Sequence, residues 1–258
     1  MEIKAGGATV HYEIAGEGKK RVVLLHGWGC DTSLMKPVAD FLAKDMTVLS
    51  IDFPGHGQSS RPPQPWGVPE YAACTMEVLR KLNFLPCSVV AHSFGGRVTL
   101  ELASGDETLF ERIILTGAAG LKKPATEESR KRSAEFQRAK KAVGLIRSMR
   151  IFGSLPDKLE EKARQKYGSR DYNALDAEMR QTFVKVVNYD QADKLPKIQQ
   201  PTLLIWGDKD TETPLWMGQT MEKHIPDAGL VVLEGGTHFA YLEQVGRFNA
   251  IAHNFFME

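Results

Sequence analysis

The chain has 258 residues, of which 42% are hydrophobic and 25% charged, an ordinary composition for a globular protein whose core needs no disulfide or metal. Its 33 Lys and Arg against 32 Asp and Glu leave a net charge of +1, so no overall field favours nucleic acid or a membrane surface. Three scattered cysteines, Cys30, Cys74 and Cys87, predict reduced thiols and no metal site.

The first 120 residues alternate short apolar runs with helical patterns. Residues 8–14 alternate between apolar and polar side chains, which predicts an antiparallel edge strand. Continuous apolar runs, typical of strands buried on both faces, follow at 21–25, 46–51, 88–91 and 112–115. Helical spacing separates these runs, at about 34–42, 70–82 and from near Phe94. The alternation predicts an α/β fold with a mostly parallel central sheet and helices on both faces.

The pattern changes over residues 121–191, which show helical segments and no strand. Three helices are expected in this stretch, over about 127–149, between Pro156 and Gly168, and around Met179, Phe183 and Val186. Strands and helices then alternate again, at 202–206, 214–224, 230–233 and 241–255. The sequence therefore predicts a core built from residues 1–120 and 192–258, interrupted by an inserted helical cap at 121–191.

The charges are divided unevenly between these parts. Residues 122–170 contain 15 Lys and Arg but only 6 Asp and Glu, a local charge of +9, so the rest of the chain carries −8. One explanation is a solvated helical surface, which is usual for charge-rich helices. The alternative is that a basic cap attracts an anionic substrate or an acidic carrier protein.

The strongest local signal is Ala-His-Ser-Phe-Gly-Gly at residues 91–96, between an apolar strand and a helix. Serine is a poor nucleophile at its ordinary pKa, so it needs an exposed position and a nearby base. A sharp strand-to-helix turn exposes Ser93, and the small residues Ala91 and Gly95 let such a turn close. The helix N-terminus adds partial positive charge where an oxyanion would form. An ordinary turn that opens a helix would use similar residues.

This segment resembles the nucleophile motif Gly-x-Ser-x-Gly of the α/β-hydrolase superfamily, with Ala91 in place of the first glycine. Residues 26–29, His-Gly-Trp-Gly, follow the strand 21–25 and look like the oxyanion loop of that family. The family takes one backbone N–H from this loop and one from the residue after the nucleophile, which implies Trp28 and Phe94 as donors. A glycine loop that only joins strand to helix would explain the glycines equally well.

The triad acid is implied by residues 207–214, which resemble the family's Gly-x-x-Asp-x-x-x-Pro segment and match it at Gly207, Asp210 and Pro214. Asp210 would then fix the tautomer of the histidine and stabilise its imidazolium form. Asp208 is the alternative acid, although it also suits a turn residue that bonds its own backbone. Some relatives place the acid after the strand that precedes the cap, but residues 116–119 contain no carboxylate.

The catalytic histidine implied by the resemblance is His238, in the loop Gly-Gly-Thr-His-Phe at 235–239. The order Ser, Asp, His along the chain is that of the superfamily. The other six histidines lie in glycine turns, in the loop 52–57, or in regular elements, and a structural role is expected for them: His26, His92, His56, His11, His224 and His253.

The resemblance implies a serine hydrolase that cleaves carboxylic esters through an acyl-enzyme on Ser93, with no metal or organic cofactor. The cap is expected to line the substrate pocket with Phe136, Val143, Ile146, Met149, Ile151 and Phe152. Three alternatives stay open: a methyl esterase acting on acyl carrier protein substrates, a carbon–carbon bond hydrolase or other triad hydrolase, and a non-catalytic receptor with the same fold.

The expected location is the cytoplasm. The N-terminus contains no apolar signal region, and no stretch approaches the roughly 20 apolar residues that a membrane span requires. The basic residues lie on helices without interleaved stacking aromatics, so nucleic acid is not an expected partner. The expected partner is a small-molecule ester, with an anionic substrate or acidic carrier as the variant for the basic cap.

Overall fold

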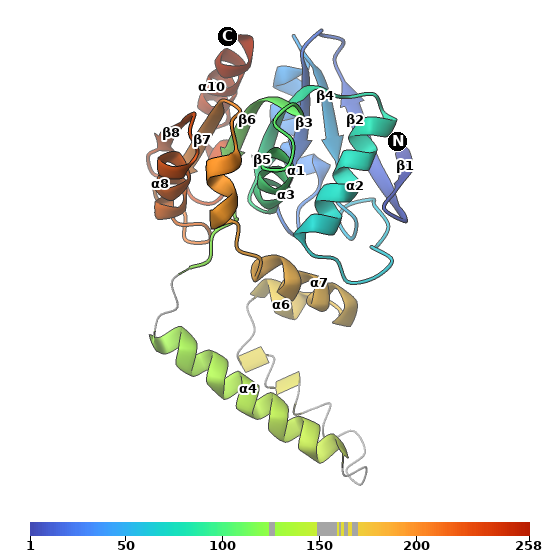
Figure 1. Cartoon of the computed structure of the whole chain (residues 1–258), viewed down its shortest axis with the longest axis vertical. Helices are drawn as coiled ribbons and strands as arrows, with labels where there is room; N and C mark the ends of the chain where they lie inside the picture. The colour runs from blue at the N-terminus through green and yellow to red at the C-terminus, as the bar shows by residue number, and fades with distance from the viewer. Residues whose placement is uncertain (124–126, 149–158, 160, 163–164, 167–169) are drawn as a thin grey trace. The chain divides into compact units, whose positions relative to one another are not determined.

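The structure is a computed structural model that describes residues 1–123, 127–148, 159, 161–162, 165–166 and 170–258 (Figure 1). The described residues form two compact units, one of Met1–Leu121 with Val184–Glu258 and one of Lys122–Phe183. The helix α7 (Ala177–Val187) runs across the second boundary. The extent of the inserted cap, expected at 121–191, therefore stays a prediction, and each unit is described by itself.

The first unit contains an eight-stranded sheet with the order β1-β2-β4-β3-β5-β6-β7-β8. The first two strands pair in antiparallel fashion, and so do β2 and β4, whereas every pair from β4 to β8 is parallel. The strands are β1 (Glu2–Ala5), β2 (Ala8–Ala15), β3 (Arg21–Leu25), β4 (Thr47–Ile51), β5 (Cys87–His92), β6 (Phe110–Thr116), β7 (Thr202–Gly207) and β8 (Ala228–Leu233). The predicted mostly parallel sheet is confirmed.

Helices cover both faces of this sheet, as expected from its continuous apolar strands (Figure 1). They are α1 (Thr32–Leu42), α2 (Val68–Lys81), α3 (Phe94–Ala103), the short 3₁₀ helix η1 (Ala192–Lys197), α8 (Leu215–His224), α9 (Ala240–Glu243) and α10 (Val245–Met257). The single helix expected over 241–255 is wrong in one respect, because the backbone breaks at Gln244 between α9 and α10. Nothing in the local sequence marks that break.

The alternation of side chains along β3 shows how the two layers are filled. Val22 and Leu24 pack in one apolar cluster with residues of α1 and α10. Val23 and Leu25 point the other way, into a cluster with residues of α2 and α3. Since all four side chains are buried, a charge at any of them would face an apolar layer. The sheet is thus a rigid support for the loops at its edge.

Most of the residues that the structure describes in the second unit are helical. It contains α4 (Glu127–Ser148), α6 (Arg170–Ala174) and most of α7, and Asp176 caps α7 by accepting hydrogen bonds from the backbone N–H groups of Glu178 and Met179. The predicted helices over 127–149 and around 179–186 match α4 and α7, whereas α6 was not predicted. The helix expected between Pro156 and Gly168 falls largely outside the described residues.

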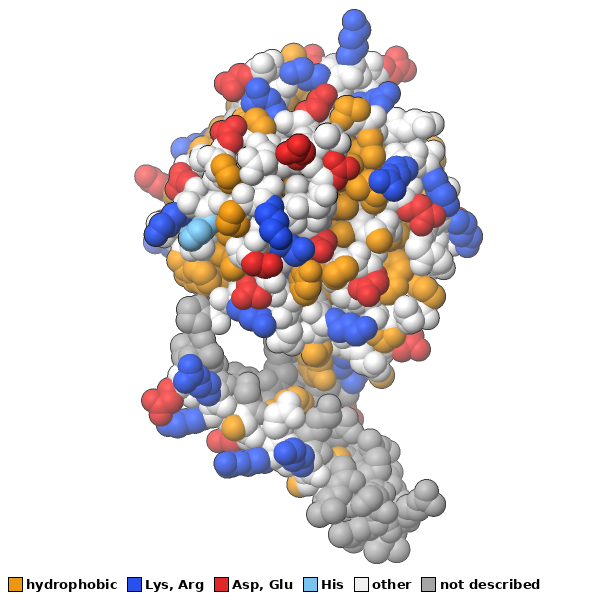
Figure 2. Space-filling view, in the orientation of Figure 1, with side chains coloured by type: hydrophobic (Ala, Val, Ile, Leu, Met, Phe, Trp, Pro, Cys, Tyr) orange, Lys and Arg blue, Asp and Glu red, His pale blue; other side chains and the backbone are white. Residues whose placement is uncertain are grey.

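One face of α4 is basic. Arg130, Lys131, Arg138 and Lys141 are exposed there, and Figure 2 shows Lys and Arg side chains along this helix. Phe136 and Val143 lie on the opposite side of the helix by their spacing, and Val143 is buried. No helix that the structure describes combines the length and apolar character needed to cross a bilayer.

Candidate active site

The loops that follow β3, β5, β6, β7 and β8 all emerge at one edge of the sheet, because parallel strands present their carboxyl ends together. This edge brings Ser93, Asp210 and His238 into one region, although they are separated by up to 145 positions in the chain. Short contacts between the loops, described below, join the three segments. The convergence is therefore a direct product of the sheet order.

Ser93 stands at a strained turn between β5 and α3. Its φ is +51°, and among the described residues only Asn83 and Ser93 have a positive φ without being glycine. Such a backbone costs on the order of 1–3 kcal/mol and persists only where its surroundings enforce it. Here Ser93 N–H donates to Thr116 O at 3.2 Å, and Ser93 O accepts from Ala119 N–H at 2.9 Å. The turn that the motif predicted is present.

Gly95 shows why this turn accepts so few residues. A Cβ atom at this position would lie 2.3 Å from the backbone oxygen of Leu25, a distance that no real side chain tolerates. The Gly95 N–H instead donates to His26 O at 3.0 Å, so α3 begins directly against the loop that follows β3. Ala91 is fully buried in β5 and fits where the family motif has its first glycine.

The loop after β3 is held by the ring of His26. His26 Nε2 accepts from Phe53 N–H at 3.0 Å, so the neutral ring carries its proton on Nδ1 and donates it to Gly27 O at 2.7 Å. Cys30 N–H also donates to Gly27 O, at 3.2 Å. Because the peptide group is planar and trans, fixing this carbonyl also fixes the opposed N–H of Trp28. Burial lowers the pKa of His26, which keeps the ring neutral in this role.

The Trp28 and Phe94 side chains also meet, with ring centroids 5.3 Å apart in an edge-to-face arrangement. The backbone N–H of Phe94 belongs to the first turn of α3, where amides have no acceptor within the helix. The loop that carries Trp28 therefore lies against the start of α3, as expected for the two oxyanion donors. That role stays a prediction.

Asp210 follows β7 and faces His238. Its Oδ1 accepts the backbone N–H groups of Glu212 and Thr213, each at 2.9 Å, and its Oδ2 lies 2.8 Å from His238 Nδ1. Burial by itself would raise the pKa of Asp210, but hydrogen bonds from His238 and Thr213 outweigh it and the pKa is lowered. The carboxyl group is therefore ionised at neutral pH.

Asp208, the alternative acid, lies elsewhere. Its Oδ1 accepts from Gly235 N–H at 2.6 Å, and its other oxygen is 3.4 Å from Lys209 Nζ. Of the two carboxylates in this turn, Asp210 is the one placed against the histidine. Gly117, at the end of β6, closes the site from the other side: a Cβ there would lie 3.2 Å from Asp210 Oδ2, with the backbone at φ +50°.

His238 lies in the loop after β8, which is hydrogen-bonded to the end of β5, directly before the turn at Ser93. Its backbone oxygen accepts from His92 Nε2 at 3.0 Å, and the centroids of the two rings are 4.7 Å apart. His92 is fully buried, and burial together with the nearby His238 lowers its pKa to about 3, so it stays neutral. The loop is braced a second time, since Thr237 N–H donates to Glu243 at 2.8 Å. The imidazole thus lies beside the residue that precedes Ser93.

The Ser93 hydroxyl makes no hydrogen bond to the residues that the structure describes. Hydrogen bonds between a nucleophile and its base are often long before substrate binds. The contacts that join the two segments are therefore the backbone and ring contacts through His92.

Thr213 is a residue of this site that sequence reasoning missed. It is buried, and its Oγ1 lies 2.8 Å from Asp210 Oδ2 and 3.2 Å from His238 Nδ1. The available signal was its position three residues after Asp210, because an aspartate in a turn accepts the N–H groups two and three residues on. That pattern alone reveals the backbone contact but not the position of the hydroxyl.

The remaining histidines have structural roles where the structure describes them. His11 pairs with Asp52, His224 Nδ1 is hydrogen-bonded to a backbone oxygen of its own helix, and His253 lies 3.1 Å from Asp45. Burial, with a smaller contribution from His26, lowers the pKa of His56 to about 3, which keeps that ring neutral. The hydrogen bonds of these four histidines go to groups other than His238, in agreement with the expected structural roles.

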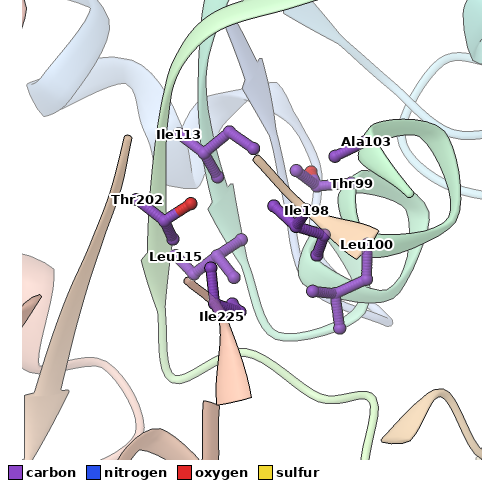
Figure 3. A pocket seen from close by; sticks show the side chains of 8 residues that line it. All are labelled: Thr99, Leu100, Ala103, Ile113, Leu115, Ile198, Thr202 and Ile225. Atoms are coloured by element: carbon purple, nitrogen blue, oxygen red, sulfur yellow. The ribbon is translucent and has the colours of Figure 1, made fainter. Parts of the chain in front are cut away.

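A small internal space lies between α3 and the sheet, and Ser93, Asp210 and His238 are not among its lining residues (Figure 3). It has no room for a water molecule, and its lining is apolar apart from two threonine side chains. The lining residues come from α3, β6, β7 and the ends of two helices: Thr99, Leu100, Ala103, Ile113, Leu115, Ile198, Thr202 and Ile225. It is a packing defect between α3 and the sheet and holds no substrate.

The cap residues expected to line a pocket are described only in part. Phe136 is half-buried and Val143 buried on α4. The side chain of Ile146, and the whole of Met149, Ile151 and Phe152, lie outside the described residues. The proposed pocket therefore stays a prediction.

Comparison with known proteins gives one family and several relatives. The model of the alpha/beta hydrolase family matches residues 22–251. The chain is 27% identical to a pimeloyl-[acyl-carrier protein] methyl ester esterase of Neisseria meningitidis, over 92% of this chain and 93% of that protein. It is also 27% identical to a 2-hydroxy-6-oxononadienedioate/2-hydroxy-6-oxononatrienedioate hydrolase of a Pseudomonas species, over 96% and 91%. The fold is that of the enol-lactonase from Burkholderia xenovorans, with a TM-score of 0.76, 21% identity and full coverage of both chains.

Proposed function

The chain belongs to the alpha/beta hydrolase family, and from this premise we propose that it is a serine hydrolase that cleaves carboxylic esters through an acyl-enzyme on Ser93. The observation that carries the proposal is the 2.8 Å contact between His238 Nδ1 and an ionised Asp210, on a loop bonded to the residue before Ser93. A base with a fixed tautomer, carried on a loop that is bonded to the segment of a serine hydroxyl, is the arrangement that serine nucleophiles require.

The first half of the reaction forms the acyl-enzyme. His238 Nε2 takes the proton of Ser93 as Oγ attacks the ester carbonyl, and Asp210 stabilises the imidazolium that results. The tetrahedral intermediate then collapses, its carbon–oxygen bond to the alcohol breaks, and His238 returns the proton to the leaving oxygen. Asp210 stays ionised throughout, which its lowered pKa supports.

The oxyanion of the tetrahedral intermediate needs donors that are already in place. The backbone N–H groups of Trp28 and Phe94 are proposed for this task, the first oriented through the Gly27 carbonyl and the second by the start of α3. Each such donor is worth about 3 kcal/mol of barrier lowering. In the second half, His238 activates a water that attacks the acyl carbonyl, and Ser93 is restored as the acid leaves.

The substrate pocket is proposed to include the apolar residues of the cap. Phe136 and Val143 share one side of α4, and Ile146, Met149, Ile151 and Phe152 extend the same apolar sequence. No metal or organic cofactor is required for this chemistry, since the proton transfer and the charge stabilisation come from the side chains and amides named above.

A reactive phosphonate tests the proposal directly. A fluorophosphonate is expected to add one adduct to the folded protein, on the peptide that contains Ser93, and to abolish hydrolysis of p-nitrophenyl acetate. The Ser93→Ala variant is expected to take no label. Labelling of Ser33 or Ser104, both on the surface of the same unit, or turnover that survives in Ser93→Ala, would contradict the proposal. A folded protein with no label and no turnover would instead support a non-catalytic receptor.

A second candidate function is a methyl esterase whose acyl group is carried by an acidic carrier protein. It is favoured by the +9 charge of residues 122–170, by the exposed basic face of α4, and by the likeness to the Neisseria esterase. Electrostatic complementarity of this kind raises association rates and specificity. The carbon–carbon bond hydrolase is favoured by the likeness to the Pseudomonas relative.

Charge reversal separates the carrier-bound substrate from a free ester. Changing Arg130, Lys131, Arg138 and Lys141 to Glu should lower kcat/KM for a carrier-linked ester by at least about tenfold, and should barely change it for a free short ester. A matched control makes the same total charge change on the other unit, at the exposed Lys19, Lys44, Lys197 and Lys223. Equal effects of both quadruple variants on both substrates would remove the carrier hypothesis.

A further inference from the structure

Thr213 lies at a point where three polar groups of the site meet. Its Oγ1 is 2.8 Å from Asp210 Oδ2, 2.8 Å from Gly117 O and 3.2 Å from His238 Nδ1. The residue is 5% exposed, so water does not substitute for these partners. The mechanism above makes no use of this hydroxyl.

The number of protons limits what the hydroxyl can do. It has a single proton, so it donates either to Asp210 Oδ2 or to Gly117 O, while His238 donates its Nδ1 proton to Asp210. Hydrogen bonds to an ionised group are about twice as strong as those between neutral groups. Since Asp210 is ionised, donation to its Oδ2 is favoured. One carboxylate oxygen then accepts from both Thr213 and His238.

We propose that Thr213 is a positioning residue of the proposed hydrolase reaction, whose hydroxyl shares Asp210 Oδ2 with His238 and so limits how strongly the carboxylate holds the imidazolium. A second donor reduces the acceptor strength that remains for the first. It also fixes the carboxylate in the position that faces Nδ1. The inference rests on the proposed function, because it assigns the His238–Asp210 pair to acid–base catalysis.

The other groups near the His238 ring do not supply this effect. His92, at the end of β5, is neutral and donates to the backbone oxygen of His238, not to its ring. Glu243, on α9, accepts from Thr237. Tyr241, whose phenol pKa is raised by burial, lies near the His92 ring. On the Nδ1 side, the partners of the ring are Asp210 and Thr213.

Two substitutions separate the hydroxyl from the volume of the side chain. Thr213→Val keeps the shape and loses the hydroxyl. The carboxylate then lacks the donor that fixes its position, so kcat should fall about tenfold. The carboxylate also holds the imidazolium more strongly, so the acid limb of the kcat/KM profile should move to higher pH. Thr213→Ser keeps the hydroxyl and should retain the wild-type limb. If packing were its role, the order would reverse, with valine tolerated and serine impaired.

A matched control tests whether any buried threonine hydroxyl behaves in this way. Thr202 is also buried, and its Oγ1 donates to Gln200 O at 2.9 Å, at the opposite end of β7. Thr202→Val should leave the pH profile of kcat/KM unchanged. Should Thr213→Val fail to fold, Thr213→Ser and Thr213→Ala provide the same comparison, because they too differ by one hydroxyl.

A spectroscopic signal tests the inference without turnover. The proton between His238 Nδ1 and Asp210 is expected to give a low-field NMR resonance, which should move further downfield in Thr213→Val and stay in place in Thr213→Ser. An unchanged resonance in Thr213→Val, with an unchanged acid limb, would overturn the inference. An unlabelled Ser93 would overturn the proposed function instead, and the resonance would still report on Thr213.

Discussion

Two histidine–carboxylate pairs of the first unit, each with a buried carboxylate, have nearly the same geometry and different surroundings. His238 Nδ1 lies 2.8 Å from Asp210 Oδ2, and His11 Nδ1 lies 3.0 Å from Asp52 Oδ2. Asp52 also accepts from Thr32 N–H at 2.7 Å and from Gln58 N–H at 2.8 Å, so it joins β2, the start of α1 and the loop after β4. Asp210 takes its backbone donors from its own turn.

The difference lies in what each carboxylate holds in place. Asp52 binds separate segments of the chain together. Asp210 is fixed by its local turn, and its remaining oxygen accepts from the His238 ring and from Thr213, a residue of the same turn. Only the Asp210 pair lies on a loop bonded to the strained serine turn. A short histidine–aspartate contact is therefore weak evidence for catalysis by itself. The strained serine beside it is what distinguishes the two pairs.

The largest expected effect comes from breaking the first pair without changing its shape. Asp210→Asn should lower kcat for an ester by about 10³- to 10⁴-fold, because the amide favours the wrong tautomer of His238. Stopped-flow or steady-state hydrolysis of p-nitrophenyl acetate measures this. Asp208→Asn is the matched control two residues away, and it should leave kcat near the wild-type value. Similar losses in both variants would mean that the turn as a whole, and not the pair, was disturbed.

The second pair should respond in stability rather than in rate. Asp52→Asn leaves the donors of Thr32, Gln58 and His11, two of which are buried, with fewer acceptors, so the free energy of unfolding should fall by about 3 kcal/mol. Urea denaturation followed by circular dichroism provides the value. At a temperature where the variant is folded, its kcat should stay far closer to wild type than that of Asp210→Asn. A rate loss as large as that of Asp210→Asn would erase the distinction between the pairs.

A smaller effect is expected from a buried histidine that has no carboxylate partner. The pKa of His56 is lowered to about 3 by burial, so the folded chain leaves the ring neutral where the unfolded chain protonates it. Its contribution to stability is complete above the ordinary pKa of about 6.5 and is lost as the pH falls toward 3, at about 1.4 kcal/mol per pH unit. His56→Gln should therefore show a shallower decline of unfolding free energy between pH 6 and pH 4, measured by urea titration at several pH values. An unchanged slope would place the acid sensitivity in other groups.

The fold was predictable from the sequence because the central strands are buried on both faces and read as continuous apolar runs, such as Arg21–Leu25. The turn at Ser93 was predictable for a local reason, since small residues on either side of it are a steric requirement. The choice of Asp210 over Asp208 came from a family pattern, and the contact with His238 depends on how β7 and β8 lie side by side.

Other features had no local signal. The hydroxyl of Thr213 meets Gly117 O across 96 positions of the chain, and His92 meets the His238 backbone across 146. Periodicity and turn patterns report on neighbours within a few residues, so contacts of this kind appear only after the sheet order is known. The break at Gln244 is similar, because it divides two helices whose combined sequence has one continuous helical pattern.

The hydrogen bond from His92 to the main chain of His238 has a mechanical consequence. The side chain of His92, next to Ser93, is hydrogen-bonded to the backbone of His238. The segments that carry Ser93 and His238 are therefore joined directly. A thermal displacement of β5 that shifts Ser93 should therefore shift His238 in the same direction. The distance between Ser93 and His238 should then change little when the sheet deforms slowly. Hydrolytic activity should persist on heating until the first unit unfolds as a whole.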